Sequence, residues 1–316
     1  MASPFYFTPT VYEWSATVDS QFAPNWALEA GYIGNRAVHT DIYHVYANMA
    51  KPTPLNQTVT PVWPDFGQFV WNTYDGISNY NALTLRLTKR FSQGLSALVS
   101  YTWAKEMDYN GGDSSEQTLL QNDNDPRADY SPGDVDTGQR FVASPIWQLP
   151  FGSGQRFLNR SGLINGLAGG WELSGIITLQ TGVPFSIYSP NDYSNSLAAY
   201  PRPDRTCNGK GPGTVAEFFD THCFTTSLLA SALASGTPRY GNAGRNILFG
   251  PSLRTADVAL MKRTKINERL NLQCRAQFFN FLNMANFSLP GAYLGSSTFG
   301  VIGGKHRLGR GGSPSG

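Results

Sequence analysis

Apolar and polar residues alternate along residues 80–106, with one interruption at residues 91–94. A period of two gives a β-strand one apolar and one polar face, and a glycine in a short break is typical of a hairpin. Each arm can run for about ten residues, whereas a soluble strand usually has about five or six. A tilted strand of about ten residues is long enough to cross the hydrocarbon layer of a membrane. The apolar positions are Leu83, Leu85, Leu87, Leu95, Ala97, Val99, Tyr101 and Trp103, with Leu98 as the exception on the polar side.

The same alternation recurs along the rest of the chain and predicts eight strands in all. The further strands are expected at residues 10–20, 26–35, 140–149, 171–180, 256–263 and 269–279, and a ninth could begin at Phe299. The connections after the first, third, fifth and seventh strands are short or medium. Those after the second, fourth and sixth are long, at residues 36–79, 105–139 and 181–251, and the last has about 20 residues. We also expect short helices at residues 214–220 and 225–235.

This alternation of short and long connections is typical of outer-membrane barrels, which carry tight turns on one rim and long loops on the other. Soluble sandwiches have no reason to keep it over eight strands. The tryptophans Trp14, Trp26, Trp103, Trp147 and Trp171 lie within or at the ends of predicted strands, where interfacial girdles place them. They could also be core aromatics of a sandwich. The combined pattern favours an all-β, antiparallel, up-and-down transmembrane β-barrel segment of about 8–9 strands.

Composition narrows the function without identifying it. The formal net charge is +2 and charged residues make up 15 % of the chain, so nothing indicates a nucleic-acid partner. The sequence contains no run of 18 apolar residues, so no transmembrane helix is predicted. The first residues lack the basic and apolar regions of a signal peptide. Bacterial barrels have even strand numbers, and an eight-stranded one would leave residues past Ser297 unused. We therefore expect a piece of a larger barrel.

The polar residues give little sign of catalysis, a metal or a cofactor. Asp123 and Asp125 are spaced like part of a calcium loop, but the full ligand spacing is absent. The acidic connection around them is expected to be a hydrated loop. His39 and His44 lack further zinc ligands nearby. No nucleophile elbow or phosphate loop is present, so the chain is not expected to be an enzyme and no cofactor is expected.

Two of the three cysteines are placed to form a disulfide. Cys207 and Cys223 bracket one segment of the longest connection. In an oxidising compartment their bond would contribute about 3 kcal/mol to stability. Two unrelated free thiols are the alternative. Cys274 lies on the apolar face of a predicted strand and is expected to be a small residue that faces lipid or core.

Five stretches in this order resemble a known family. They are NYNALTLRLTKRFSQGLSALVSYTWAKEMD at residues 79–108, RFVASPIWQLPFG at 140–152, GGWELSGIITLQTGVPFSI at 169–187, YGNAGRNILFGPSLRTADVALMKRTKI at 240–266 and RLNLQCRAQFFNFLNMANF at 269–287. The chain is similar here to the large TonB-dependent outer-membrane receptors of the Oar-like type. The resemblance runs from about Val11 to Gly300.

The resemblance implies an uptake receptor in the outer membrane of a Gram-negative bacterium. Such receptors have a barrel of about 22 strands, of which residues 1–300 would form the C-terminal third. They also have an N-terminal plug, and a TonB complex of the inner membrane drives transport of an extracellular ligand. None of those other parts lies in this sequence. Residues 301–316 are rich in Gly and Arg, whereas the family ends in a strand with a terminal aromatic residue. We expect a frameshift or truncation there, and a disordered tail.

In a complete receptor the polar faces of the strands would line the lumen and touch the plug. The residues expected there are Arg86, Glu172, Gln180, Gln273, Arg275 and Gln277. Ligand specificity would lie on the long loops, and nothing in the sequence names the ligand. Two alternatives remain open. One is a soluble, secreted all-β module that binds a glycan or a protein, and the other is a small porin-like barrel.

Overall fold

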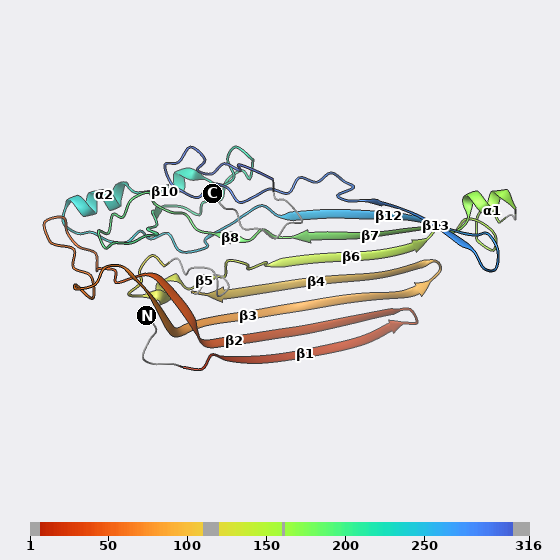
Figure 1. Cartoon of the computed structure of the whole chain (residues 1–316), viewed down its shortest axis with the longest axis horizontal. Coiled ribbons are helices and arrows are strands. Elements are labelled where there is room, and N and C mark those ends of the chain that lie inside the picture. Colours follow the sequence, from red (N-terminus) through yellow and green to blue (C-terminus); the bar gives the residue numbers. More distant parts are fainter. Residues whose placement is uncertain (1–6, 110–119, 160–161, 306–316) are drawn as a thin grey trace.

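A computed structural model, which describes residues 7–109, 120–159 and 162–305, shows one large antiparallel sheet with folded connections at one rim (Figure 1). Its strands are, in spatial order, β1 (Thr10–Ala23), β2 (Trp26–Ala47), β3 (Phe69–Ser92), β4 (Leu95–Asp108), β6 (Gln139–Gln148), β7 (Trp171–Gln180), β12 (Leu253–Lys265) and β13 (Asn271–Phe278). The two-residue strand β5 (Ser131–Pro132) pairs with β4. The predicted up-and-down order is confirmed. Among the described residues β1 and β13 stay unpaired on their outer sides, so the sheet is open.

The other elements lie in the connections. Those at the rim with long connections, the loop rim, are η1 (Pro126–Asp129), β8 (Pro184–Phe185), β9 (Asp204–Arg205), η2 (Thr221–Cys223), β10 (Phe224–Thr225), α2 (Ser227–Ala234) and β11 (Leu248–Phe249). At the opposite rim, the turn rim, the connection 149–170 contains α1 (Leu163–Ala168). Neither α-helix in the described part of the chain is long and apolar enough to cross a membrane.

Strand pairing joins the apolar positions into one continuous surface, the apolar face. Residues that pair directly across an antiparallel sheet lie on the same face. One row across the sheet contains Ala16, Tyr32, Leu83 and Trp103, and another contains Leu28, Leu87, Val99, Ala143, Ile177 and Ala256. In the described residues the only other sheets are two two-stranded pairs within the connections. Val18 therefore stays 69 % exposed and Trp103 58 % exposed.

Aromatic side chains border the apolar face at both rims. Trp14 and Trp103 lie toward the loop rim, and Trp26, Trp147 and Trp171 lie toward the turn rim. Trp103 and Leu95, near the two borders, are eight residues apart on β4, which is about 27 Å along an extended strand. This is close to the height of about 25 Å expected for the lipid-facing band of a membrane barrel.

Two lysines reinforce the border at the turn rim. The Lys89 ammonium lies 5.5 Å from the ring centroid of Trp26, and that of Lys262 lies 4.9 Å from the ring centroid of Trp171. A cation over an indole face is attracted by the ring quadrupole, and a lysine at an apolar border keeps its charge at the polar side.

The hairpin of β3 and β4 turns at the place that the sequence predicts. Ser92 pairs with Leu95, so the loop between β3 and β4 has two residues. Gln93 and Gly94 have φ of 52° and 79°. A two-residue turn with positive φ at both positions follows the right-handed twist of the strands. The turn sets the register that keeps Leu83, Leu85 and Leu87 on one face.

The predicted length of the connection at residues 36–79 is wrong. β2 continues to Ala47 and β3 begins at Phe69, so the connection covers only residues 48–68. The pairing of β2 with β3 shifts register between Val38 and Thr40, Thr40 and Ile42, and His44 and Ala47. Each shift breaks the period of two, so the alternation in the sequence did not predict the outer halves of both strands.

Two further sequence predictions are wrong, and one is confirmed. Residues 214–220 form no helix, because the Thr214 hydroxyl caps the Glu217 amide in a tight turn. No strand follows Phe299 in the described residues, which end at 305. The helix predicted at 225–235 is confirmed as α2. Residues 301–305 were expected to belong to a disordered tail, but Ile302 among them is buried. Residues 306–316 lie outside the described part of the chain.

We expect Gly34→Ala to destabilise the outer end of the sheet. A Cβ at Gly34 would lie 2.3 Å from the Trp14 indole nitrogen, so the ring must leave its place over β2. Because Trp14 is 45 % exposed and its ring can turn aside, we expect a cost of about 1 kcal/mol. Urea unfolding of the complete protein in detergent micelles, followed by tryptophan fluorescence, would measure the change. Gly67→Ala is the control, because a Cβ there meets nothing within 4 Å. Equal stability of the two variants would contradict the packing of Trp14 on Gly34.

Candidate functional site

The long connections fold into one unit at the loop rim, here called the loop cap (residues 48–68, 120–138, 181–252 and 279–305) (Figure 1). Hydrogen bonds join separate connections. The Ala50 amide donates to the Ser196 carbonyl at 2.9 Å, and the Gln121 side chain donates to the Gly241 carbonyl at 3.2 Å. The loop cap is therefore a packed surface instead of a set of independent loops.

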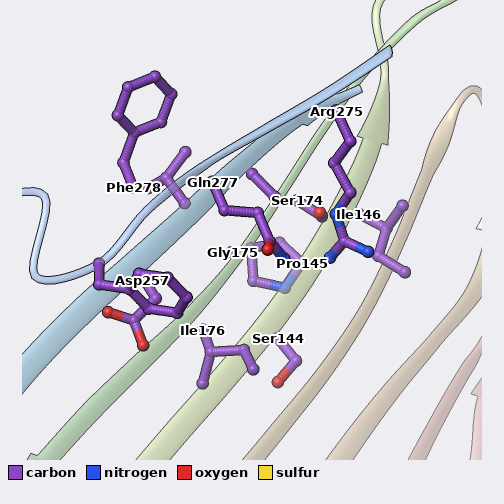
Figure 2. A pocket seen from close by; sticks show the side chains of 13 residues that line it. Ser144, Pro145, Ile146, Ser174, Gly175, Ile176, Asp257, Arg275, Gln277 and Phe278 are labelled. Atoms are coloured by element: carbon purple, nitrogen blue, oxygen red, sulfur yellow. The ribbon is translucent and has the colours of Figure 1, made fainter. Parts of the chain in front are cut away.

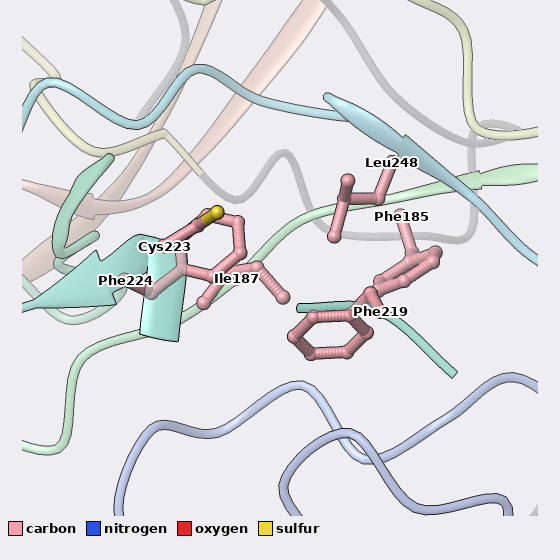
Figure 3. Close-up of a cluster of buried hydrophobic side chains, with 6 residues drawn as sticks. All are labelled: Phe185, Ile187, Phe219, Cys223, Phe224 and Leu248. Carbon is pink, nitrogen blue, oxygen red and sulfur yellow. The ribbon is translucent and has the colours of Figure 1, made fainter. Parts of the chain in front are cut away.

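The loop cap has its own apolar core, shown in Figure 3. Its buried residues are Phe185, Ile187, Phe219, Cys223, Phe224 and Leu248. Phe299, which follows the last strand, packs edge-on against Phe219 with ring centroids 5.2 Å apart. This core holds the start, middle and end of the longest connection together with the last one. A segment of about 70 residues without such a core would be flexible.

The structure joins Cys207 and Cys223 in a disulfide with their Cα atoms 5.0 Å apart. Cys223 is 1 % exposed and belongs to the apolar core, whereas Cys207 is exposed. The bond thus attaches a surface segment to the core. Cys274 is a free, exposed thiol on the apolar face, in the row that contains Trp171 and Lys262.

One buried charge pair joins two connections of the loop cap, and another attaches the loop cap to the sheet. The Arg202 guanidinium pairs with Asp129, and that of Arg245 pairs with Asp108 at the end of β4. Arg245 also lies 3.3 Å from the carboxylate of Asp134. Asp129 is 2 % exposed and Arg202 is 4 % exposed. The acidic connection is therefore partly buried, which corrects the prediction of a hydrated loop.

A further arginine–carboxylate pair lies within the longest connection. Arg239 donates to both oxygens of Asp204, at 2.8 and 2.7 Å. These hydrogen bonds lower the pKa of Asp204 below its usual value, since they favour the charged carboxylate. The pair joins residues that precede and follow α2 in the chain.

The candidate calcium and zinc residues have a structural role in the described part of the chain. The Nδ1 atom of His44 lies 2.5 Å from an Asp123 oxygen, and its Nε2 atom lies 2.9 Å from the Thr73 hydroxyl. His44 is buried. This contact ties the acidic connection to β2 and β3. His39 stacks instead on Phe7, with ring centroids 5.1 Å apart.

One group outside those predictions has the donor set of a metal site. Glu217, Asp220 and His222 each place one ligand atom within 4.8 Å of the others. His222 is exposed, and its backbone amide donates to Asp220 as the first turn of η2 begins. The hydrogen bond accounts for the position of the carboxylate without a metal.

The polar face of the sheet contains the residues that the sequence assigned to a lumen. Arg86 and Glu29 pair across β2 and β3 at 3.9 Å, and Glu172 lies 4.0 Å from Arg263. A hollow of about 330 Å³ lies where β6, β7, β12 and β13 meet (Figure 2). Its polar lining consists of Ser144, Ser174, Asp257, Arg275 and Gln277. The rest of the lining is apolar and includes Ile146, Ile176 and Phe278.

The residues that connect the loops could not be predicted from the sequence. Arg202 and Asp129 are 73 positions apart, and Arg245 and Asp108 are 137 apart. No local spacing marks such pairs, because partners can be identified only after the chain has folded. A weak signal was present. The acidic connection at residues 105–139 contains only one arginine, Arg127, so its carboxylates need cationic partners from elsewhere in the chain.

Comparisons with known proteins agree with this architecture. A family model described as an outer membrane beta barrel domain matches residues 2–311. The outer membrane transporter YddB from Escherichia coli is structurally similar, with a TM-score of 0.50 and 9 % identity over 95 % of this chain and 32 % of that chain. The FrpB iron transporter from Neisseria meningitidis (F3-3 variant) gives a TM-score of 0.41 and 12 % identity over 95 % of this chain and 30 % of that chain.

A search of curated proteins finds no match. The chain spans about a third of the length of the two solved transporters. At 9 % identity the likeness to YddB shows the fold alone.

We expect Arg245→Leu to loosen the loop cap. The substitution leaves Asp108 as a buried carboxylate without its partner, and breaking a buried pair costs about 3–5 kcal/mol. Hydrogen exchange of the complete protein in micelles should show faster exchange over residues 120–138. Arg86→Leu is the matched control, because its exposed pair with Glu29 is worth less than about 1 kcal/mol. Unchanged protection in Arg245→Leu would contradict the role of this pair.

The disulfide gives a separate test. Cys207→Ser combined with Cys223→Ser should destabilise the loop cap by about 3 kcal/mol, because the unfolded connection gains freedom. Thermal unfolding in micelles measures this, with Cys274→Ser as the neutral control. Thiol titration of the unmodified, denatured chain should find one reactive group, Cys274. Reaction of all three cysteines would show that the bond is absent.

Proposed function

Because the chain belongs to the outer membrane beta-barrel family, we propose that it forms part of a TonB-dependent uptake receptor of the Oar-like type. The chain lies in the outer membrane of a Gram-negative bacterium, where the apolar face meets lipid. In our proposal it supplies about a third of the barrel wall, together with extracellular loops at the loop rim. The turn rim faces the periplasm.

The observation that carries the proposal is the open sheet with one apolar face. The outer edges of β1 and β13 present unpaired backbone groups within the described residues. Unpaired backbone groups are too costly in hydrocarbon, so membrane strands occur in closed barrels. Further strands are needed to pair with both edges. A large barrel meets this need, and its wall would be longer than the 316 residues of this chain.

The loop cap and the polar face support uptake over a purely structural role. The loop cap is held by a core, a disulfide and buried ion pairs, so it offers an ordered surface to an extracellular ligand. The polar face, with Arg275 and Gln277 around its hollow, suits contact with a plug inside the barrel. Plug movement driven by the TonB complex would then release the ligand inward. The nature of the ligand stays open.

A soluble, secreted all-β binding module is the alternative, and the structure favours it less. Such a module would cover its apolar face with a second sheet. In the described residues that face carries Val18, Trp103 and Leu272, each more than half exposed. The role we propose is transport, and we assign no residue to catalysis.

Cysteine labelling in whole cells tests the orientation of the chain. In the complete protein carrying Cys274→Ser, Thr58→Cys at the loop rim should react with a membrane-impermeant maleimide. Glu268→Cys at the turn rim should react only after the outer membrane is permeabilised. Both native residues are exposed. Labelling of both sites in intact cells, or release of the protein into the medium, would overturn the membrane assignment.

The dependence on TonB is tested with the same complete protein. Detergent-solubilised receptor should bind a column that carries the purified periplasmic domain of TonB. A receptor whose N-terminal TonB box is deleted is the control and should pass through. If both forms pass through, the TonB part of the proposal fails while the barrel assignment stands.

A further inference from the structure

A basic hollow of about 900 Å³ lies at the outer border of the apolar face, beside the loop cap. It is lined by Tyr12, Trp14, Arg36, Val38, His39, Asp75, Ile77, Tyr109 and Arg127. These residues come from the outer ends of β1, β2 and β3 and from the acidic connection. It is separate from the hollow on the polar face.

Strand pairing shows which side of the sheet this hollow occupies. Arg36 pairs with Tyr12 on β1 and with Asn79 on β3, so the three share a face. Arg36 is four positions beyond Tyr32, which lies in the row of Trp103. Four residues extend about 13 Å along a strand. The arginine thus lies on the lipid-facing side, just beyond the apolar band, at the depth of the lipid head groups.

The charges in the hollow favour an anion. Arg36 and Arg127 are both exposed, and neither belongs to an ion pair recorded for the described residues. The Tyr109 hydroxyl lines the same hollow as Arg127, and it donates to the backbone carbonyl of Asp75. Asp75 is the one carboxylate among the lining residues, and the Thr73 hydroxyl already donates to it at 2.5 Å.

Aromatic side chains form the wall of the hollow toward the membrane. Trp14 lies directly over Gly34, where there is no side chain to displace it. Trp14 is 45 % exposed and Tyr12 is 57 % exposed. Amphipathic rings at the interface contact both the acyl chains and the polar head groups of lipids. The apolar face then continues from Trp14 toward Val18 on the same strand.

We propose that this hollow binds the phosphorylated head group of a glycolipid in the outer leaflet of the membrane. Guanidinium groups donate paired hydrogen bonds to phosphate oxygens, and the apolar face below accepts the acyl chains. A free phosphate would gain nothing from that face, so the lipid is the better ligand. The proposal rests on the orientation proposed above, with the loop rim outside, and is independent of TonB and of the transported ligand.

Native mass spectrometry of the complete protein, solubilised in zwitterionic micelles, tests the proposal. Bisphosphorylated lipid A is the probe. We expect Arg36→Gln combined with Arg127→Gln to weaken its binding at least tenfold. Arg86→Gln, an exposed arginine of β3 on the polar face, should leave binding unchanged. Arg36→Lys combined with Arg127→Lys keeps the charge but loses the paired hydrogen bonds, so it should weaken binding less than the glutamine variant does.

Two comparisons on the unmodified chain keep the test decisive even where a variant fails to fold. Lipid A without its phosphates should bind at least tenfold more weakly, and inorganic phosphate should not displace the phosphorylated form. Equal binding of the two lipids would overturn the proposal. Displacement by inorganic phosphate would assign the hollow to a free anion and overturn it as well. Circular dichroism in the same micelles identifies variants that have folded.

Discussion

Backbone hydrogen bonding between neighbouring antiparallel strands is the interaction on which the rest of this structure depends. It fixes the register, and the register decides which side chains share a face. Because the side-chain period is two, a slip of one residue would move the leucines of β3 to the polar face. The two-residue turn at Gln93 and Gly94 prevents that slip in the central hairpin. The apolar face, the aromatic borders and the lysines beside them all follow from this register.

Different interactions stabilise the loop cap, where strand pairing in the described residues is limited to the two-residue pairs β8–β11, β9–β10 and β4–β5. There the chain depends on a small apolar core, a disulfide between Cys207 and Cys223 and arginine–aspartate pairs at the end of β4. Burial of ion pairs is costly, so their contribution is mainly to specify which connection packs on which. The molecule thus divides into a wall organised by backbone register and a rim organised by side chains.

Prediction from the sequence succeeded where one face of each strand meets a uniform environment. The eight main strands and the polar positions of Arg86 and Arg275 were predicted, since lipid on one side imposes strict alternation. The prediction failed at the outer halves of β2 and β3, because register shifts interrupt the period and the loop connections pack on these segments, with Ile42 buried against Tyr109 and Leu120. It also failed at residues 214–220, where the Thr214 side chain competes with helical hydrogen bonding.

The sequence by itself determined the strand order, the two faces and the pairing candidates among three cysteines. The strand order and the two faces depend on local periodicity, and three cysteines allow only three possible pairs. Only the tertiary structure decided that Arg245 meets Asp108, that His44 meets Asp123 and that Arg36 and Arg127 border the same hollow. Such contacts join residues far apart in the chain, and a one-dimensional pattern contains no distance between them until the strands have paired.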